Sequence, residues 1–221
     1  MSRPSPGSTE KGESGKMIVS STRLRHARTL GAAAALLVLL AGFAHAGEPT
    51  IQVRATVEKV IRILQDPSLR GDSRRAERRA QLRGAIAPHF DFTDMARSAL
   101  AAEWKKRTPQ EQEEFTGLFS QLMERSYVGK IELYTDEVVR YVKEHVENGF
   151  ARVDTVIVTK QGQEILILYR MHKVGNRWKV HDVVAEGVSL VNNYRHQFRS
   201  IIRRSSYEEL VKILRAKRDE G

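Results

Sequence analysis

The feature that most constrains the fold is a change in the spacing of apolar residues at Glu137. Before this position apolar side chains recur at helical spacing, and after it they alternate with a period of two. The helical spacing returns after Gly187. Helices, then consecutive strands, then helices again predict an α+β domain built on one sheet.

Four strand-like runs occupy the middle of the chain, and turn-forming pairs separate them. The loops between them are short enough for hairpins, so we expect an antiparallel meander of four strands. The third run is apolar on both faces from Ile165 to Tyr169, and it therefore needs cover on both faces. The expected strands are Val138–Val146, Ala151–Lys160, Glu164–Val174 and Arg177–Ala185, with turns at Asn148-Gly149, Gln161-Gly162 and Gly175-Asn176.

Helices are expected on both sides of the strands. The clearest start lies at Thr108, where Pro109 suits the first helical position and Glu111 completes a capping box. After the strands, apolar residues from Val188 onward share one helical face, and a last helix begins at Ser205 or Ser206. The earlier expected helices span residues 51–64, 71–88 and 92–100.

The N-terminal segment has the pattern of a secretory signal peptide. Arginines at 23, 25 and 28 precede an apolar run over residues 30–43, which closes with Ala44-His45-Ala46. The run is short for a membrane helix, which needs about 20 residues; an uncleaved anchor is the alternative interpretation. We expect a signal peptide over residues 1–46, with Met17 as an alternative start, and one domain over residues 47–221.

Composition narrows the chemistry. The chain has no cysteine, which excludes thiolate zinc sites, iron–sulfur clusters and cysteine nucleophiles. Residues 47–221 carry a net charge of +6, which suits an anionic lipid headgroup or membrane surface but is also ordinary solubilising charge.

Metal-binding histidine motifs, phosphate-binding loops and nucleic-acid recognition motifs do not occur. Ser189 lacks the second glycine of a nucleophile elbow, and we expect it to cap a helix. We therefore predict no enzyme, cofactor, metal site or nucleic-acid partner.

Several segments resemble one family of exported proteins. The block from Asp182 to Phe198, DVVAEGVSLVNNYRHQF, resembles the signature of the toluene-tolerance family, which includes the periplasmic phospholipid-binding component of the maintenance-of-lipid-asymmetry (Mla) pathway. The segment FDFTDMAR from Phe90 to Arg97 and the Trp178-Lys179-Val180 run are similar to other family segments. So is the helix that carries Phe115, Leu118, Phe119, Leu122 and Tyr127.

The resemblance implies a fold and a function. The family fold is a curved antiparallel sheet packed with N- and C-terminal helices around an apolar pocket, similar to the nuclear-transport-factor architecture. The resemblance also implies a periplasmic carrier that holds phospholipid acyl chains and shuttles the lipid between outer and inner membranes with transient membrane contact. The implied partners are an inner-membrane ABC lipid transporter and an outer-membrane lipoprotein–porin complex. Some family members occur in hopanoid-associated gene clusters, so a hopanoid or other lipid is an alternative cargo.

Candidate lipid contacts are the apolar and aromatic side chains of the expected helices and strands, although each would also suit an ordinary core. Arginines near the signature block are candidate headgroup contacts because guanidinium matches phosphate; the alternative is pairing with Asp91, Asp94 or Glu186. The lipid candidates are Phe92, Met95, Leu118, Phe119, Leu122, Tyr141, Ile165, Ile167, Tyr169, Val183, Val188, Val191, Tyr194 and Phe198, and the headgroup candidates are Arg97, Arg195 and Arg199.

Two other function classes stay open at this point. Cone-shaped sheets with a pocket also host enzymes, in which Asp182 with Tyr141 or Tyr169 could act as acid and base. An adaptor protein whose own side chains fill the interior is the third class. A perturbed carboxylate in the pocket would favour the enzyme, and an interior without a cavity would favour the adaptor.

Overall fold

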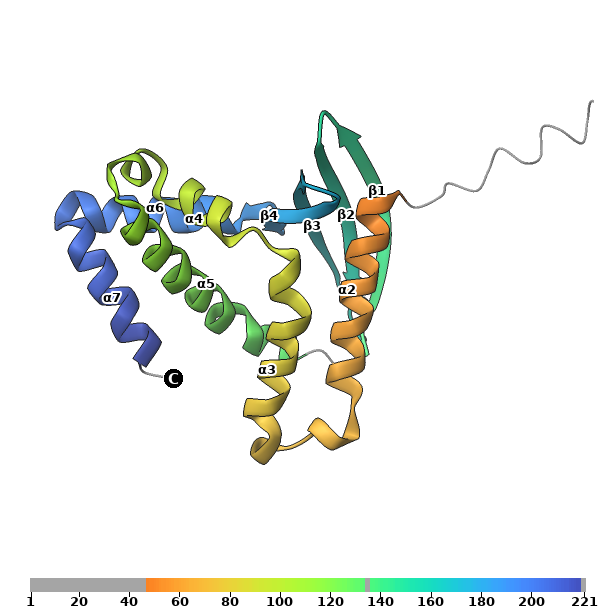
Figure 1. Cartoon of the computed structure of the whole chain (residues 1–221). Helices are drawn as coiled ribbons and strands as arrows, with labels where there is room; N and C mark the ends of the chain where they lie inside the picture. The colour runs from red at the N-terminus through yellow and green to blue at the C-terminus, as the bar shows by residue number, and fades with distance from the viewer. Residues whose placement is uncertain (1–46, 134–135, 220–221) are drawn as a thin grey trace, which may run out of the picture. The chain divides into compact units, whose positions relative to one another are not determined.

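The structure is a computed structural model that describes residues 47–133 and 136–219. The expected signal peptide lies outside the described residues. The described elements follow the order helices, strands, helices, as expected for an α+β domain (Figure 1). The helices are α2 (Glu48–Gln65), α3 (Arg75–Ile86), α4 (Phe92–Leu100), α5 (Pro109–Glu132), α6 (Leu190–Arg204) and α7 (Tyr207–Asp219). The strands are β1 (Val138–Glu147), β2 (Phe150–Val158), β3 (Glu164–Val174), β4 (Arg177–Ala185) and β5 (Val188–Ser189).

The sheet is an antiparallel meander in the order β1-β2-β3-β4-β5. The prediction of four strands was one short, because Val188 pairs with Ala185 in β5 and does not join the following helix. Glu186 and Gly187 both have positive φ, at 51° and 79°, and this left-handed pair reverses the chain in a two-residue turn. The prediction of the α+β class is confirmed, with five strands in place of four.

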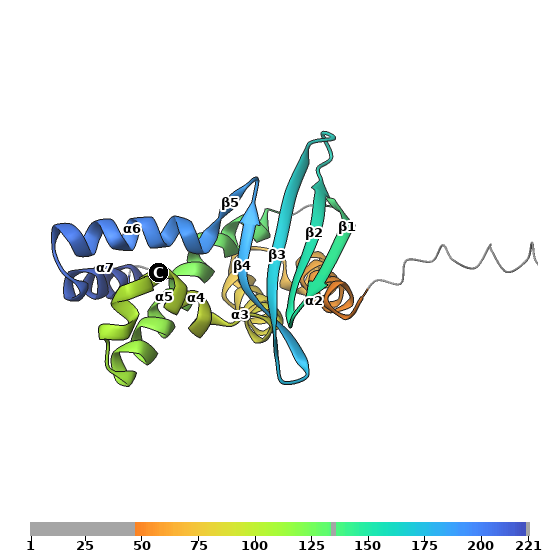
Figure 2. The same ribbon diagram turned by 90° about the horizontal axis from the view of Figure 1, so that it is seen from above.

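Two irregularities bend the long strands. The register of β1 against β2 shifts between Tyr141 and Lys143, and that of β3 against β4 shifts between Arg170 and Met171. A β-bulge puts an extra residue into one strand, so it bends that strand and increases its local twist. Helices α2 and α3 lie behind the strands in Figure 2, over one face of the sheet.

The C-terminal helices form a core of their own with α4 and α5. Phe115 and Phe119 of α5 are fully buried, and Phe198 of α6 meets both rings edge-on at 5.6 and 5.8 Å between centroids. Tyr194 of α6 meets Phe119 in the same edge-to-face manner, at 5.6 Å. Such pairs add about 0.5–1.5 kcal/mol beyond burial, so this aromatic cluster holds the helical part of the molecule together.

A second core lies between α2 and the sheet. Val53 of α2 is buried against strand residues that include Val153 and Met171. The indole Nε1 of Trp178 donates to Glu48, at 3.1 Å, and the backbone N–H of Trp178 donates to Gln52, at 3.2 Å. These contacts fix the first half of α2 to β4, while its second half packs with α3 and the end of α5.

The starts of α5 and α6 are set by side chains that the sequence indicated. Thr108 Oγ1 accepts from the Glu111 N–H at 3.3 Å, and Glu111 Oε2 accepts from the Thr108 N–H at 2.7 Å, which confirms the capping box. Ser189 Oγ accepts from the Asn192 N–H at 3.1 Å and caps α6, as predicted. The stretch expected as one helix over 71–88 is shorter, because 3₁₀ turns replace its two ends.

Asp182, inside the signature block, joins the sheet to the helices. Its carboxylate accepts from Arg170 Nη1 at 3.0 Å, Ser189 Oγ at 2.7 Å and the Val191 N–H at 3.2 Å. The residue is 4% exposed, so these bonds form largely away from water, where charge-assisted hydrogen bonds are strong. Asp182 thereby sets the direction in which α6 leaves the sheet.

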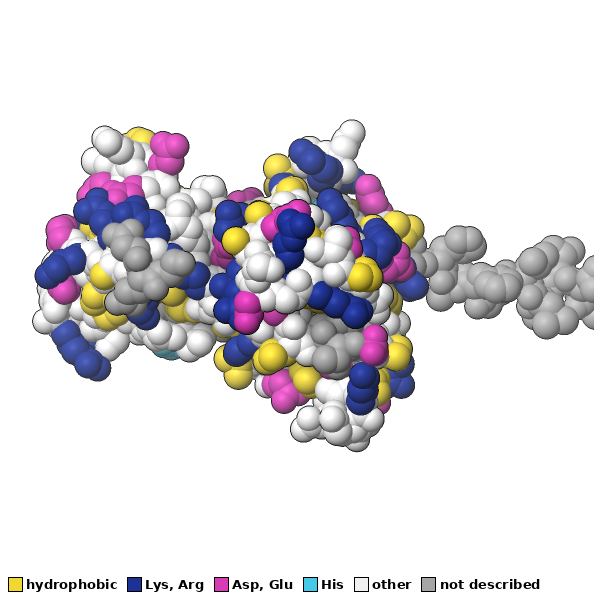
Figure 3. All heavy atoms as spheres, turned by 90° about the horizontal axis from the view of Figure 1, so that it is seen from below, with side chains coloured by type: hydrophobic (Ala, Val, Ile, Leu, Met, Phe, Trp, Pro, Cys, Tyr) yellow, Lys and Arg dark blue, Asp and Glu magenta, His cyan; other side chains and the backbone are white. Residues whose placement is uncertain are grey.

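The face of the molecule in Figure 3 carries both positively and negatively charged side chains. Lys and Arg side chains lie there among Asp, Glu and apolar side chains. Across residues 47–133 and 136–219, no helix combines the length and the apolar character that crossing a membrane requires.

Candidate functional site

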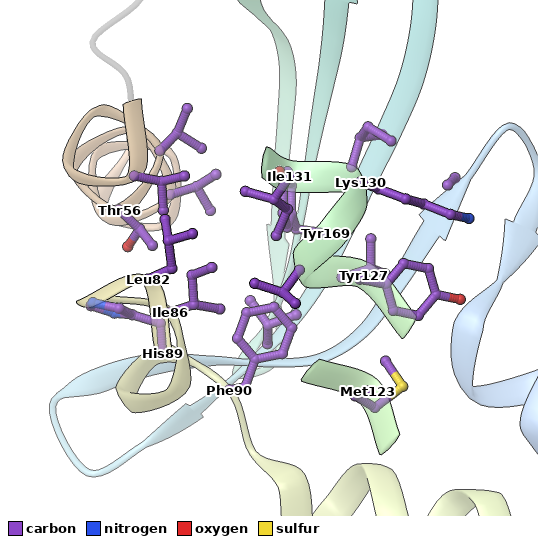
Figure 4. A pocket seen from close by; sticks show the side chains of 18 of the residues that line it. Thr56, Leu82, Ile86, His89, Phe90, Met123, Tyr127, Lys130, Ile131 and Tyr169 are labelled. Carbon is purple, nitrogen blue, oxygen red and sulfur yellow. The ribbon is translucent and has the colours of Figure 1, made fainter. Parts of the chain in front are cut away.

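A cavity of about 610 Å³ lies between the sheet and helices α2, α3 and α5 (Figure 4). This volume falls within the range of about 300–1,000 Å³ that is typical of small-molecule sites. Its wall is apolar over most of its area. The apolar lining comes from α2 (Val53, Val57, Val60, Ile61, Leu64), α3 (Leu82, Ile86), the segment up to α4 (Ala87, Phe90, Phe92), α5 and its end (Met123, Tyr127, Val128, Ile131, Leu133), the sheet (Val139, Ile157, Ile165, Ile167, Tyr169, Met171, Val180, Val183, Ala185) and α6 (Leu190).

The two facing walls follow from elementary periodicity. On α2, Val53, Val57 and Val60 recur every three or four residues and so lie on one helical face. On β3, Ile165, Ile167 and Tyr169 alternate with residues that point to the opposite face of the sheet. Most of these side chains are only half-buried by the protein, and the surface they keep lies on the cavity.

Few polar groups reach the cavity wall. Tyr169 lines it beside Thr155, and burial raises the pKa of the Tyr169 phenol. The Thr155 hydroxyl donates to the Ile167 carbonyl at 3.1 Å, so it is satisfied within the sheet. His89 lies near the Gln52 amide, 3.4 Å from Nδ1 to Nε2, and burial followed by nearby cations lowers its pKa. A lowered pKa keeps His89 neutral at pH 7.

Charged residues stand at the rim. Arg83 of α3 binds Glu124 of α5 through two hydrogen bonds, from Nε at 2.7 Å and from Nη2 at 2.6 Å. This pairing raises the pKa of Arg83. Lys130 lies on α5 with its ammonium 5.2 Å from the centre of the Tyr127 ring, and Glu137 stands at the start of β1. The arrangement is an apolar chamber with ionic groups at its edge, suited to a molecule with apolar and polar ends.

The family comparison agrees with this geometry. The family model described as "MlaC protein" matches residues 54–216, which is most of the chain. This chain belongs to the MlaC protein family. The resemblance to the toluene-tolerance family and the Mla component is thereby confirmed, and a curated relative from Pseudomonas putida is named toluene tolerance protein Ttg2D.

Similar proteins include curated relatives and a solved structure. The Intermembrane phospholipid transport system binding protein MlaC of Haemophilus influenzae is 23% identical over 138 residues, which are 60% of this chain and 64% of that protein. The Pseudomonas putida protein is 22% identical over 122 residues, 54% of this chain and 57% of that protein. The matches thus span less than two thirds of either curated relative. Their names describe phospholipid transport and toluene tolerance, and neither describes catalysis.

A solved structure extends the comparison to the fold. The phospholipid-binding protein of Ralstonia solanacearum, determined in complex with a phospholipid, matches with a TM-score of 0.70 and 26% identity. The match covers 79% of this chain and 98% of the Ralstonia chain. The family fold is therefore common to both proteins.

The structure divides the sequence-predicted lipid contacts into two groups. Five of them line the cavity, and the other nine lie elsewhere. The lining residues are Phe92, Ile165, Ile167, Tyr169 and Val183. Met95, Leu118, Phe119, Leu122, Val191, Tyr194 and Phe198 pack in the helical core, Tyr141 packs beside the sheet core under Arg54, and Val188 is 54% exposed.

The helical residues lie away from the cavity because α4, α5, α6 and α7 present their apolar faces to one another. Phe119 and Phe198 meet edge-to-face and are buried. Tyr141 stacks under the Arg54 guanidinium at 4.3 Å, and burial raises its pKa to about 12. Val188 belongs to the edge strand β5, and its side chain is exposed.

The three arginine candidates also lie outside the cavity lining. Arg97 pairs with Asp94, which was the alternative expected for it. Arg195 Nε donates to the Ser98 carbonyl at 2.7 Å and so ties α6 to α4. Arg199 lies on α6 with Arg203, away from the sheet. The arginine and lysine side chains that do line the cavity are Arg83 and Lys130, at its rim.

Sequence reasoning missed most of the α2 and α3 wall. The signal was present in the apolar stripe of α2, which includes Val57, Val60 and Leu64, but a stripe of this kind is equally typical of core packing. The wall residues Met123, Tyr127 and Ile131 continue the expected helix of α5 on a neighbouring face. Among the described residues, no cluster of three or more His, Cys, Asp or Glu could hold a metal ion.

The acid–base pair imagined for an enzyme does not form. Asp182 is committed to Arg170, Ser189 and the α6 backbone, and it is absent from the cavity lining. Tyr169 therefore faces the cavity without that carboxylate. The cavity itself contradicts an adaptor whose own side chains fill the interior.

Proposed function

We propose that this chain is exported, that its mature form is residues 47–221, and that it carries a phospholipid whose acyl chains lie in the cavity. The observation that supports this most is the apolar chamber of about 610 Å³. It lies in a fold shared with a phospholipid-bound Ralstonia protein at a TM-score of 0.70. The lipid is cargo, and the chemistry needs no cofactor.

The energetics of lipid transfer explain why such a chamber is needed. Each methylene that leaves an apolar environment for water costs about 0.8 kcal/mol. Two acyl chains with about 30 methylenes therefore cost on the order of 20 kcal/mol if fully exposed. Side chains such as Val57, Ile165 and Ile167 offer the chains an apolar wall, so the lipid can cross water without that cost.

The proposed pathway places the carrier in the periplasm, where it shuttles phospholipid between the outer and inner membranes. The basic and apolar N-terminal pattern that ends at Ala46 supports export. The name of the Haemophilus relative describes a binding protein of an intermembrane phospholipid transport system, which supports shuttling. The proposed partners are an inner-membrane ABC lipid transporter and an outer-membrane lipoprotein–porin complex, with transient membrane contact.

Mass spectrometry of the native protein tests the cargo. The protein is isolated from the periplasm of a Gram-negative host without detergent, and its intact mass is measured before and after organic extraction. Near-stoichiometric phospholipid is the expected result. A hopanoid from a producing host would keep the fold and change the cargo, and no lipid in any host would overturn the carrier proposal.

A vesicle assay tests the transfer step separately. Donor vesicles carry a self-quenched fluorescent phospholipid, and acceptor vesicles carry none. We expect the protein to raise the rate at which fluorescence appears in proportion to its concentration. A protein that binds lipid but leaves this rate unchanged would be a lipid-binding protein without a shuttle function.

A further inference from the structure

The polar end of a bound phospholipid would need a cationic group on the cavity wall. Among the described residues that line the cavity, three side chains can carry positive charge: Arg83, His89 and Lys130. A phosphodiester carries one negative charge, so a cation at the rim that lacks its own carboxylate is the best candidate to bind it.

Two of these three side chains have no free positive charge for a phosphate, because one is paired and the other is neutral. Arg83 is neutralised by Glu124, which holds it through two hydrogen bonds of 2.7 and 2.6 Å. His89 stays neutral at pH 7 because burial and nearby cations lower its pKa. Figure 4 places His89 with Thr56 on one side of the cavity, away from Lys130.

Lys130 differs from both. Its side chain is exposed, and no carboxylate of the described residues forms an ion pair with it. The carboxylates on either side in the sequence are engaged elsewhere, Glu124 with Arg83 and Glu132 with Arg78 and Arg79. The contact that holds Lys130 is the face of the Tyr127 ring, 5.2 Å from its Nζ. A cation–π contact is not an ion pair and does not use up the three N–H donors of an ammonium, so donors remain for oxygen acceptors.

Neighbouring side chains of α5 point in different directions relative to the cavity. In Figure 4 the Lys130 ammonium and the Tyr127 hydroxyl both point away from the apolar chamber, on the side opposite Thr56 and His89. Ile131, the next residue along α5, points into the chamber. One turn of α5 thus presents apolar surface to acyl chains and an ammonium to the outside.

We propose that Lys130, oriented by the Tyr127 ring, binds the phosphodiester of the cargo headgroup at this rim. This inference rests on the proposed carrier function and specifies its substrate class: glycerophospholipids are preferred over uncharged lipids with the same acyl chains. Lysine acts here as a point charge, so it recognises the phosphate shared by different headgroups and does not discriminate among them.

Paired lipids and matched variants test the proposal. Equilibrium binding of pyrene-labelled phosphatidylglycerol and of pyrene-labelled diacylglycerol with identical chains is measured for the wild-type protein, Lys130→Gln, Lys130→Arg and the control Lys105→Gln. Lys105 is an exposed lysine outside the cavity lining. Circular dichroism melting checks that each variant is folded.

We expect Lys130→Gln to weaken phosphatidylglycerol binding about three- to tenfold. Diacylglycerol binding should change less than about twofold, because the apolar chamber is untouched. Lys130→Arg and Lys105→Gln should bind both lipids like the wild-type protein. Raising salt from about 50 to 500 mM should narrow the gap between wild type and Lys130→Gln, because the contact is exposed.

Two results would overturn the assignment. An equal loss for both lipids would mean that Lys130 supports the wall and not the phosphate, and an unchanged affinity for phosphatidylglycerol would place the phosphate elsewhere. Failure of the carrier function itself is distinguishable, because the wild-type protein would then bind neither lipid.

Discussion

Two neighbouring residues of β3 provide the sharpest test of the cavity as a lipid site. Ile165 lines the cavity, whereas Leu166 points to the opposite face of the sheet and is 45% exposed. Replacing each by asparagine changes β-propensity in the same strand to a similar extent. The two variants therefore differ mainly in whether a polar amide faces the acyl chains.

The magnitude follows from the partial exposure of Ile165. Full burial of an isoleucine side chain is worth about 1.5–3 kcal/mol, so covering the roughly one third of Ile165 that the protein leaves exposed contributes about 0.5–1 kcal/mol to lipid binding. An amide that acyl chains desolvate without a partner costs a further 1–3 kcal/mol or so. We expect Ile165→Asn to weaken phospholipid binding by about 1.5–4 kcal/mol, which is about ten- to thousandfold.

The assay is equilibrium competition against a fluorescent phospholipid, with thermal melting of each variant as the check on folding. Leu166→Asn should stay within about twofold of wild type, because exposed substitutions usually change free energies by no more than about 0.5 kcal/mol. Equal weakening by both variants, or none by Ile165→Asn, would refute the reasoning that the lipid lies against this face of β3.

Three further predictions concern stability. Burial lowers the pKa of His181, so below about pH 6.5 the unfolded chain binds a proton more readily than the folded chain, and the free energy of unfolding should fall from pH 7 to 5. In urea titrations His181→Gln should make this decline less steep, and the decline that remains includes the part due to His89, whose pKa is also lowered. An unchanged slope in His181→Gln would contradict this. Asp182→Asn should cost about 2–3 kcal/mol in chemical denaturation by weakening charge-assisted bonds at the β4–α6 junction, while the control Asp72→Asn, at a carboxylate that is 90% exposed, should cost under about 0.5 kcal/mol. Thr108→Ala should cost about 1 kcal/mol through loss of the α5 cap, measured in the same way, and a neutral result would mean that the capping box contributes nothing to stability.

Local chemistry was enough to predict most of the secondary structure. The bounds of α4, β3 and β4 agree with the expected ranges, because apolar period and turn chemistry act over a few residues. The caps at Thr108 and Ser189 were predictable for the same reason. The short strand β5 was missed because its two residues show no period, and it depends on the positive φ of Glu186.

The family signature was informative about membership, but its large aromatic residues do not line the cavity. Tyr194 and Phe198 lie within the block that resembles the family, yet both are buried in the helical core. Asp182 of the same block holds α6 at the sheet. Two of these residues thus belong to the helical core and one to the junction between sheet and helix, and the cavity wall lies largely outside the block.

Sequence alone thus determined which faces of the helices and strands are apolar, because that depends on the order of residues along each element. Only the tertiary structure decided what those faces meet. Phe119 and Val57 both lie on apolar helical faces, but Phe119 meets the rings of α6 whereas Val57 meets the cavity. Periodicity carries no information about the partner across the interface, since a ring, a strand and an acyl chain all remove the same side chain from water.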